Sequence, residues 1–168
     1  MLTSPPSLTP FTGKKIGEIC SFSLGKNNTQ NHCAHFVSHV MEYEFSETCK
    51  NFTFTDKQAA GKGATIRVER LFNVSPEIDI WTKRPLTLMA CLIFVTISSN
   101  VRQHGSQLIM GDNPRKHVGI YNNGTVWNYS NTHNKVMADP EKLFIDKFKH
   151  SYRTAGQTVE FFYGRFLK

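Results

Sequence analysis

The clearest hydrophobic pattern in the chain begins at residue 33. Apolar side chains recur at Phe36, Val37, Val40 and Met41, which is the spacing of one face of an α-helix. The pattern predicts a short amphipathic helix that buries this face against a sheet. Cys33 opens the helix on the same face, so its thiol would meet the strands that the helix covers.

Four later segments have the composition of β-strands. Residues 86–97 form a near-continuous apolar run, as expected for a central strand covered on both faces. Residues 117–121 and 125–129 flank Asn122, Asn123 and Gly124, and the Asn-Gly dipeptide favours a tight hairpin turn. A final strand is expected at residues 159–166.

The remaining segments have weaker patterns. Helices are expected around residues 15–22, at 64–72 with Ile66 and Leu71 inward, and from Pro140 to about 150, N-capped by Asp139. Residues 25–31 and 100–116 are expected to be polar loops, the second at the rim of a site. Residues 1–12 are an extended lead-in to a single domain over 13–168. Together these elements predict an α+β fold with an early helix on an antiparallel sheet.

Net charge and hydropathy narrow the range of partners. The chain carries 20 Lys and Arg against 13 Asp and Glu, a formal net charge of +7 that favours an anionic partner. The basic residues are scattered without an Arg-rich stripe, so nucleic acid is not expected. The first residues lack a signal-peptide pattern, and the most apolar run is too short to span a bilayer. We therefore expect a chain made in the cytoplasm without membrane insertion.

The four cysteines, at positions 20, 33, 49 and 91, lack the CxxC spacing typical of zinc sites. His35 and His39, four residues apart, could face one divalent metal together, but no carboxylate supports such a site. We therefore expect no metal and no cofactor. Setting Cys33 aside leaves either one disulfide with an odd cysteine or three buried thiols, and the odd count favours thiols. The other three cysteines are then core residues.

Cys33 has the setting of a nucleophile. A thiol at a helix N-terminus lies at the positive end of the helix dipole, which favours the thiolate. A histidine on a neighbouring strand can take its proton, and a third polar side chain can orient that histidine. His117 begins a predicted strand, and Asn128 lies on the strand that returns from the turn, with Asn131 as its rival. The alternative is that Cys33 is a small buried core residue.

Other polar residues near Cys33 are candidates for supporting roles. An oxyanion hole needs donors aimed at the developing negative charge. We expect the backbone N–H of Cys33 and the side chain of Asn27 to supply them, with Asn28 and Gln30 as alternatives. His32, next to the nucleophile, is expected to line the cleft, whereas the histidines at 104, 133 and 150 are expected to be solvated.

Two blocks resemble the signatures of the NlpC-type and amidase-type papain-like peptidases. They are NHCAHFV at residues 31–37 and HVGIYNNGTVWN at residues 117–128, the second being the more specific. The usual Asp before the cysteine and the usual Ser-Gly after it are replaced by His32 and by Ala34 and His35. That departure places the chain in a divergent branch of the group.

The resemblance implies a papain-like fold with Cys33 as nucleophile, His117 as base and Asn128 as the orienting residue. It also implies hydrolysis of amide bonds, commonly in peptidoglycan stem peptides. Type VI secretion amidase effectors belong to this group, and size, basic charge and the missing leader suit them. The chain is then expected to be a monomeric antibacterial toxin acting in the periplasm or cell wall of a target cell. Its partners would be a cognate immunity protein and the secretion machinery.

Two other functions stay open. The same triad serves lipid acyltransferases and protein glutamine deamidases, although the sequence has no membrane-facing amphipathic stretch that would favour the acyltransferase. A non-catalytic binding or structural module, with Cys33 in its core, is the remaining alternative.

Overall fold

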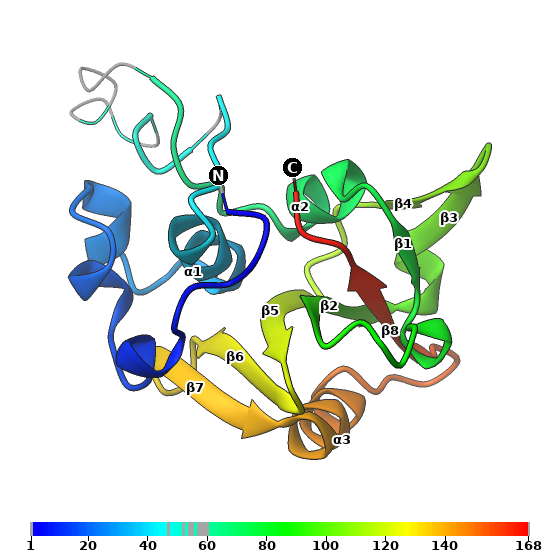
Figure 1. Ribbon diagram of the computed structural model, residues 1–168. Helices are drawn as coiled ribbons and strands as arrows, with labels where there is room; N and C mark the ends of the chain where they lie inside the picture. Colours follow the sequence, from blue (N-terminus) through cyan, green and yellow to red (C-terminus); the bar gives the residue numbers. More distant parts are fainter. Residues whose placement is uncertain (1, 47, 52, 54–55, 57–60, 168) are drawn as a thin grey trace.

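The computed structural model describes residues 2–46, 48–51, 53, 56 and 61–167. These residues form an α+β fold in which helices cover both faces of a mainly antiparallel sheet (Figure 1). The helices are α1 (Cys33–Val40), α2 (Val68–Val74) and α3 (Glu141–Ser151). The strands are β1 (Ile78–Ile80), β2 (Ala90–Ile97), β3 (Val101–His104), β4 (Gln107–Met110), β5 (Lys116–Asn122), β6 (Thr125–Ser130), β7 (Lys135–Pro140) and β8 (Val159–Gly164). The expected α+β class is confirmed.

The main sheet has the strand order β1-β8-β2-β5-β6-β7, and its neighbouring strands are antiparallel. Leu92 and Phe94 of β2 face α1 and α2, whereas Ile93 and Val95 face α3. Alternate residues of a strand point to opposite faces, so a strand covered on both sides must be apolar throughout. The apolar run therefore does form the central strand. The strand begins at residue 90 and not at 86, because the preceding residues form a turn in which the Pro85 carbonyl accepts a hydrogen bond from the Leu88 N–H.

The predicted hairpin between β5 and β6 is also present. Asn122 pairs with Thr125, so the turn consists of Asn123 and Gly124 alone. Both have positive φ, 49° and 84°, as a type I′ turn requires. The turn fixes the register that carries His117 and Asn128 on adjacent strands.

The first predicted helix is confirmed, and its apolar face packs in the larger core cluster. The helix expected at 15–22 is instead a single 3-10 turn, Ile16–Glu18, and a second 3-10 turn, Ser23–Lys26, follows it. Ser23–Lys26 also occupies the start of the expected 25–31 loop. The helix expected at 64–72 begins only at Val68, because the Ala64 carbonyl accepts from Cys49. Leu71 is buried as expected, but Ile66 is only half-buried.

Other boundaries differ from expectation for local reasons. Residues 100–116 hold the β3–β4 hairpin beside α2 and β1, not a loop at the rim of a site. Asp139 does not cap α3, because its carboxylate faces the sheet and binds Asn128. The last strand ends at Gly164. Within the expected lead-in, residues 9–11 form a 3-10 turn and Leu8 is buried, while residue 1 lies outside the described residues.

Candidate active site

The start of α1 is fixed by two asparagine side chains. Asn31 Oδ1 accepts from the Cys33 backbone N–H at 3.1 Å, and Asn131 Oδ1 accepts from the His32 N–H at 3.1 Å. Helix N-termini leave backbone donors without intrahelical partners, and these side chains satisfy two of them. The consequence is that the thiol of Cys33 is held at one defined place over the sheet.

That place is where β5 and β6 separate. Their pairing runs only from Asn122–Thr125 to Ile120–Trp127, whereas β5 stays paired with β2 as far as Lys116. β6 stays paired with β7 as far as Ser130. The two strands therefore diverge from their shared turn, and α1 lies over the opening (Figure 1). The backbone N–H of Val118, on the open part of β5, interacts with the Cys33 thiol.

His117 and Asn128 meet across this opening. His117 Nε2 lies 3.1 Å from Asn128 Oδ1. Gly119 makes the contact sterically feasible, because a Cβ there would lie 2.8 Å from Val126 Cγ1 and 3.2 Å from the Asn128 Cβ. Because Gly119 has no side chain, the side chain of Asn128 on β6 can approach His117. The predicted pairing of His117 with Asn128 is thus present in the structure.

The orientation of the Asn128 amide follows from its second partner. Its Nδ2 donates to Asp139 Oδ2 at 3.0 Å, so Oδ1 must be the atom that faces His117. An amide oxygen only accepts, which places the ring hydrogen of neutral His117 on Nε2. The Nδ1 atom then carries the lone pair and is free to accept a proton.

Burial keeps the His117 ring neutral. The ring lies between aromatic side chains of α3, with its centroid 4.4 Å from that of Phe148 and 6.0 Å from that of Phe144. Burial lowers the pKa of His117 to about 3; the hydrogen bond to Asn128 opposes this shift, while the charge of Lys147 adds to it. At neutral pH His117 is therefore a proton acceptor and not an imidazolium.

Burial also decides the state of Cys33. Its side chain is fully buried, and this raises the pKa of the thiol to about 12 although the N–H groups of Val118, Ala34 and Cys33 itself favour the thiolate. The expectation that the helix dipole yields a thiolate is therefore wrong for this closed structure, because desolvation outweighs the dipole. The described residues include no hydrogen bond between Cys33 and His117.

Tyr152, just after α3, interacts electrostatically with Cys33. Burial raises the pKa of Tyr152, and negative charge on Cys33 raises it further. The Tyr152 ring also packs on Phe148, at 5.2 Å between centroids. No pattern in the sequence indicates this interaction, because Tyr152 lies beyond the expected end of α3.

The expected supporting residues take other positions. Asn27 Oδ1 accepts from Thr29 and so closes its own loop instead of facing Cys33. The Cys33 N–H already donates to Asn31, so it does not point into an oxyanion hole here. His32 does not line a cleft: it is 1% exposed and bonds to His35 and to the Asn27 carbonyl. The rival Asn131 supports the helix start and does not touch His117.

A second group of polar side chains lies apart from this site. Cys20 and Cys49, expected to be ordinary core residues, are both buried beside His35 and His39. The expectation that the two histidines lack further ligands is therefore wrong, because the thiols of Cys20 and Cys49 can supply two more in place of a carboxylate. Among the other histidines, those at 104, 133 and 150 are exposed as expected.

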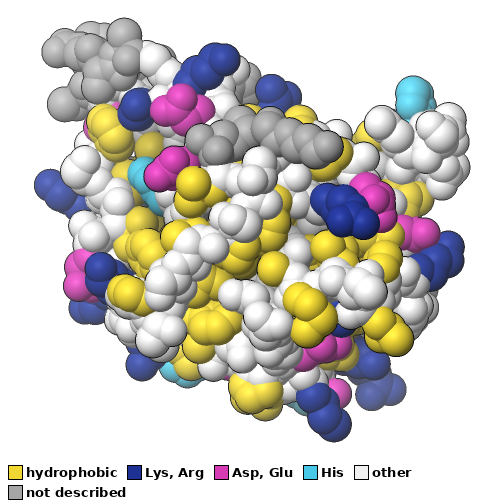
Figure 2. Space-filling view, in the orientation of Figure 1, with side chains coloured by type: hydrophobic (Ala, Val, Ile, Leu, Met, Phe, Trp, Pro, Cys, Tyr) yellow, Lys and Arg dark blue, Asp and Glu magenta, His cyan; other side chains and the backbone are white. Residues whose placement is uncertain are grey.

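No family model, curated protein sequence or solved structure matches the chain. In the part of the chain that the structure describes, no helix has the length and apolar character needed to cross a membrane. On the face shown in Figure 2, Lys and Arg side chains are scattered around the outline and do not gather into one patch.

Proposed function

We propose that this protein is a papain-like cysteine hydrolase of amide bonds, with Cys33 as nucleophile, His117 as base and Asn128 as the orienting residue. The observation that carries the proposal is the His117–Asn128–Asp139 chain, which orients the His117 ring and leaves its Nδ1 lone pair free, next to Val118, whose backbone N–H interacts with the Cys33 thiol. An oriented imidazole near a nucleophile is the arrangement that covalent hydrolysis requires.

The reaction starts from a neutral thiol and a neutral imidazole. Cys33 Sγ attacks the amide carbonyl carbon while His117 Nδ1 takes the thiol proton, giving a tetrahedral adduct. The imidazolium then returns that proton to the leaving amine, and the C–N bond breaks to form a thioester. Water, deprotonated by Nδ1, releases the acid and restores the thiol. Asn128 stabilises the transient imidazolium through Oδ1, with Asp139 behind it.

Substrate binding must also uncover the sulfur. Cys33 has no exposed surface, so a substrate has to displace the groups that cover it. The Cys33 N–H becomes an oxyanion donor only when Asn31 releases it.

The substrate class rests on the resemblance and on charge. The HVGIY block is similar to that of papain-like peptidoglycan amidases, and a net charge of +7 suits an anionic cell wall. Peptidoglycan stem peptides are therefore the proposed substrate. A role as a secreted toxin in the periplasm or wall of a target cell, with an immunity protein and secretion machinery as partners, is part of the same proposal.

One observation favours a second candidate function. A fully buried thiol with a pKa of about 12 is typical of a core cysteine, as in a non-catalytic binding or structural module. In that case a variant without the Cys33 thiol would still fold and would still bind its partner.

Digestion of purified muropeptides, followed by mass analysis, separates the two candidates. The wild-type protein should release peptide fragments, Cys33→Ala should release none, and Cys91→Ala should match the wild type because that thiol lies in the other core cluster. An inert wild-type protein, or a Cys33→Ala protein as active as the wild type, would contradict the hydrolase proposal.

A further inference from the structure

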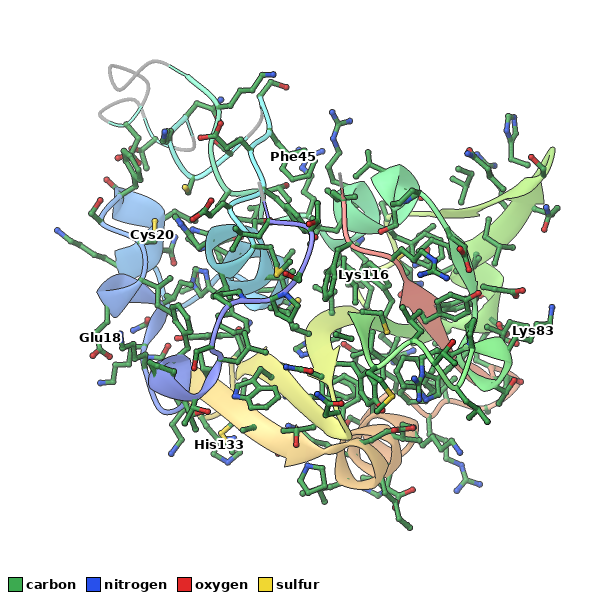
Figure 3. The ribbon with its side chains drawn as sticks, in the orientation of Figure 1. Glu18, Cys20, Phe45, Lys83, Lys116 and His133 are labelled. Atoms are coloured by element: carbon green, nitrogen blue, oxygen red, sulfur yellow. The ribbon has the colours of Figure 1, made fainter. Side chains whose placement is uncertain are left out.

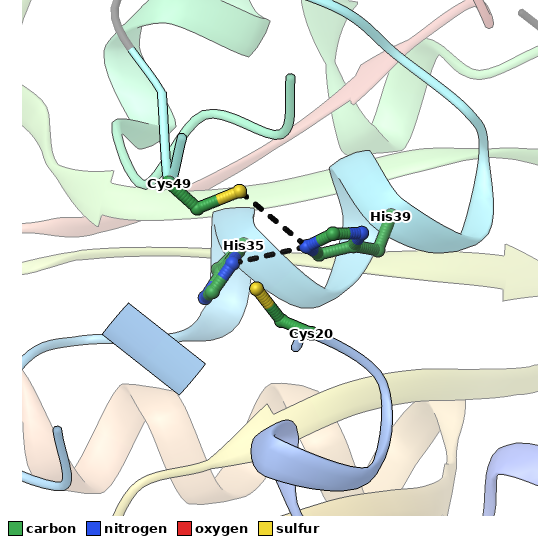
Figure 4. A group of neighbouring side chains, drawn as sticks. All are labelled: Cys20, His35, His39 and Cys49. Atoms are coloured by element: carbon green, nitrogen blue, oxygen red, sulfur yellow. Dashed lines mark hydrogen bonds between the residues drawn. The ribbon is translucent and has the colours of Figure 1, made fainter. Parts of the chain in front are cut away.

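The cluster of Cys20, His35, His39 and Cys49 brings four potential metal ligands together from distant segments. Their ligand atoms all lie within 4.8 Å of one another, and Figure 4 shows both sulfur atoms directed at the two rings. His35 Nε2 and His39 Nε2 are 3.1 Å apart, and Cys49 Sγ is 3.7 Å from His39 Nε2. From this geometry we propose that the four side chains bind one structural zinc ion.

The separations fit tetrahedral zinc. Bonds of about 2.3 Å to sulfur and about 2.0–2.1 Å to nitrogen put the ligand atoms roughly 3.3–3.8 Å apart. The distances of 3.1 and 3.7 Å are close to those values. Two thiolates and two neutral imidazoles are also the ligand set that zinc favours over the oxygen-seeking cations. Four protein ligands fill the coordination shell, which is typical of a structural ion.

The hydrogen bonds behind His35 direct its free nitrogen into the cluster. His32 Nε2 lies 2.6 Å from the Asn27 carbonyl oxygen, which can only accept, so Nε2 carries the hydrogen of a neutral ring. His32 Nδ1 is then an acceptor, and His35 Nδ1, at 3.1 Å, must donate to it. His35 Nε2 is left with a lone pair aimed at the other ligands. Metal-binding histidines commonly have such a partner on the second ring nitrogen.

The site lies where the fold has the least regular structure. Cys20 follows a 3-10 turn of the N-terminal segment, and Cys49 lies in the loop after α1, where the described pairing is an isolated bridge between Phe45 and Gly63. Among the residues that the structure describes, the apolar cluster around the two thiols is small. A zinc ion would tie both segments to α1 and supply binding energy that this small cluster cannot.

Metal content and cobalt spectroscopy test the site on the whole chain, purified without a metal-affinity tag. We expect about one zinc ion per chain, and cobalt substitution should give the charge-transfer and d–d bands of tetrahedral thiolate coordination. Stripping the metal with a chelator should lower the unfolding temperature. A wild-type chain that binds neither zinc nor cobalt, or that contains a Cys20–Cys49 disulfide after purification, overturns the proposal.

Matched variants locate the ion. Cys49→Ala should lose the zinc, while Cys91→Ala, which removes a buried thiol outside the cluster, should keep it. His39→Asn should likewise lose it, with His133→Asn as the exposed control. Retention of full zinc by Cys49→Ala and His39→Asn contradicts the assignment. Failure of either variant to fold leaves the wild-type cobalt spectrum as the deciding measurement.

Discussion

The two sites share one helix but are assembled in different ways. The catalytic candidate combines the start of α1 with β5 and β6, and hydrogen bonds between regular elements set its geometry. The cluster of Cys20, His35, His39 and Cys49 combines the flank of α1 with two irregular segments. In Figure 3, Cys20 lies on one side of α1 and Lys116 of β5 lies on the other.

The difference shows which kind of site strand pairing can hold in place without a bound ligand. Strand register and a glycine gap bring His117 to Asn128 without any ligand. Segments without a ladder have no register, so Cys20 and Cys49, which lie on such segments, need an ion or another cross-link to stay beside the two histidines of α1. The following predictions test this contrast, beginning with the largest expected effect.

Replacing His117 with Ala should remove the base. Loss of acid–base catalysis costs roughly 10²–10⁴-fold in rate, and we expect a fall of that size in muropeptide cleavage. The zinc content should stay that of the wild type, because His117 lies outside the cluster. Loss of zinc together with activity would show that the two sites are not separate.

Asn128→Ala should lower activity by less than His117→Ala, because nucleophile and base remain but the ring is no longer held. It should also cost about 1–3 kcal/mol of stability, since Asp139 and His117 lose a buried partner. Asn131→Ala is the comparison, and it should lower the rate by less than Asn128→Ala, because Asn131 helps to hold the helix start but has no hydrogen bond to His117 among the described residues. Kinetics and urea unfolding of both variants check this, and a larger rate loss for Asn131→Ala would reverse the roles.

Acid should destabilise the fold through His117. The pKa of this ring is about 3 in the folded chain against an ordinary value of 6.5, because burial disfavours the charged form. Between these values the unfolded chain binds a proton that the folded chain does not, so the contribution is full above pH 6.5 and falls as the pH drops. The slope approaches about 1.4 kcal/mol per pH unit.

His117→Gln should remove this part of the slope. Urea unfolding of both proteins across the acid range gives the difference directly, and the contribution of the other histidines cancels because both proteins contain them. Identical slopes would mean that His117 is not buried as a neutral ring.

Tyr152→Ala should have the smallest effect. Removing this phenol, whose pKa responds to the charge of Cys33, should speed alkylation of that thiol by iodoacetamide several-fold, without changing alkylation of Cys91. Peptide mapping after timed labelling measures both rates. An unchanged Cys33 rate would mean that other groups close the site.

The sequence predicted the elements with strong local signals. The amphipathic spacing gave α1, the apolar run gave β2, and the Asn-Gly pair gave the turn that places Asn128 by His117. It missed β1, β7 and the β3–β4 hairpin, because β1, β3 and β4 are only three or four residues long and β7 is mixed in polarity. Asp139 was assigned to a cap for the same reason, although it supports Asn128 from β7.

The cluster of two cysteines and two histidines was missed for a different reason. The helical spacing of His35 and His39 was visible in the sequence, but Cys20 and Cys49 reach them through segments without periodic patterns. No local sequence pattern indicates that these four side chains lie together. The charge state of Cys33 could not be predicted from the sequence either, because it depends on how completely the surrounding core excludes water.

The most direct test measures cleavage and zinc on one preparation of Cys33→Ala. Muropeptide products report the catalytic site, and the metal content of the same sample reports the second site. We predict that cleavage is abolished while about one zinc ion per chain remains, as in the wild type. Cleavage at the wild-type rate would contradict the assignment of Cys33, and joint loss of cleavage and zinc would contradict the separation of the two sites.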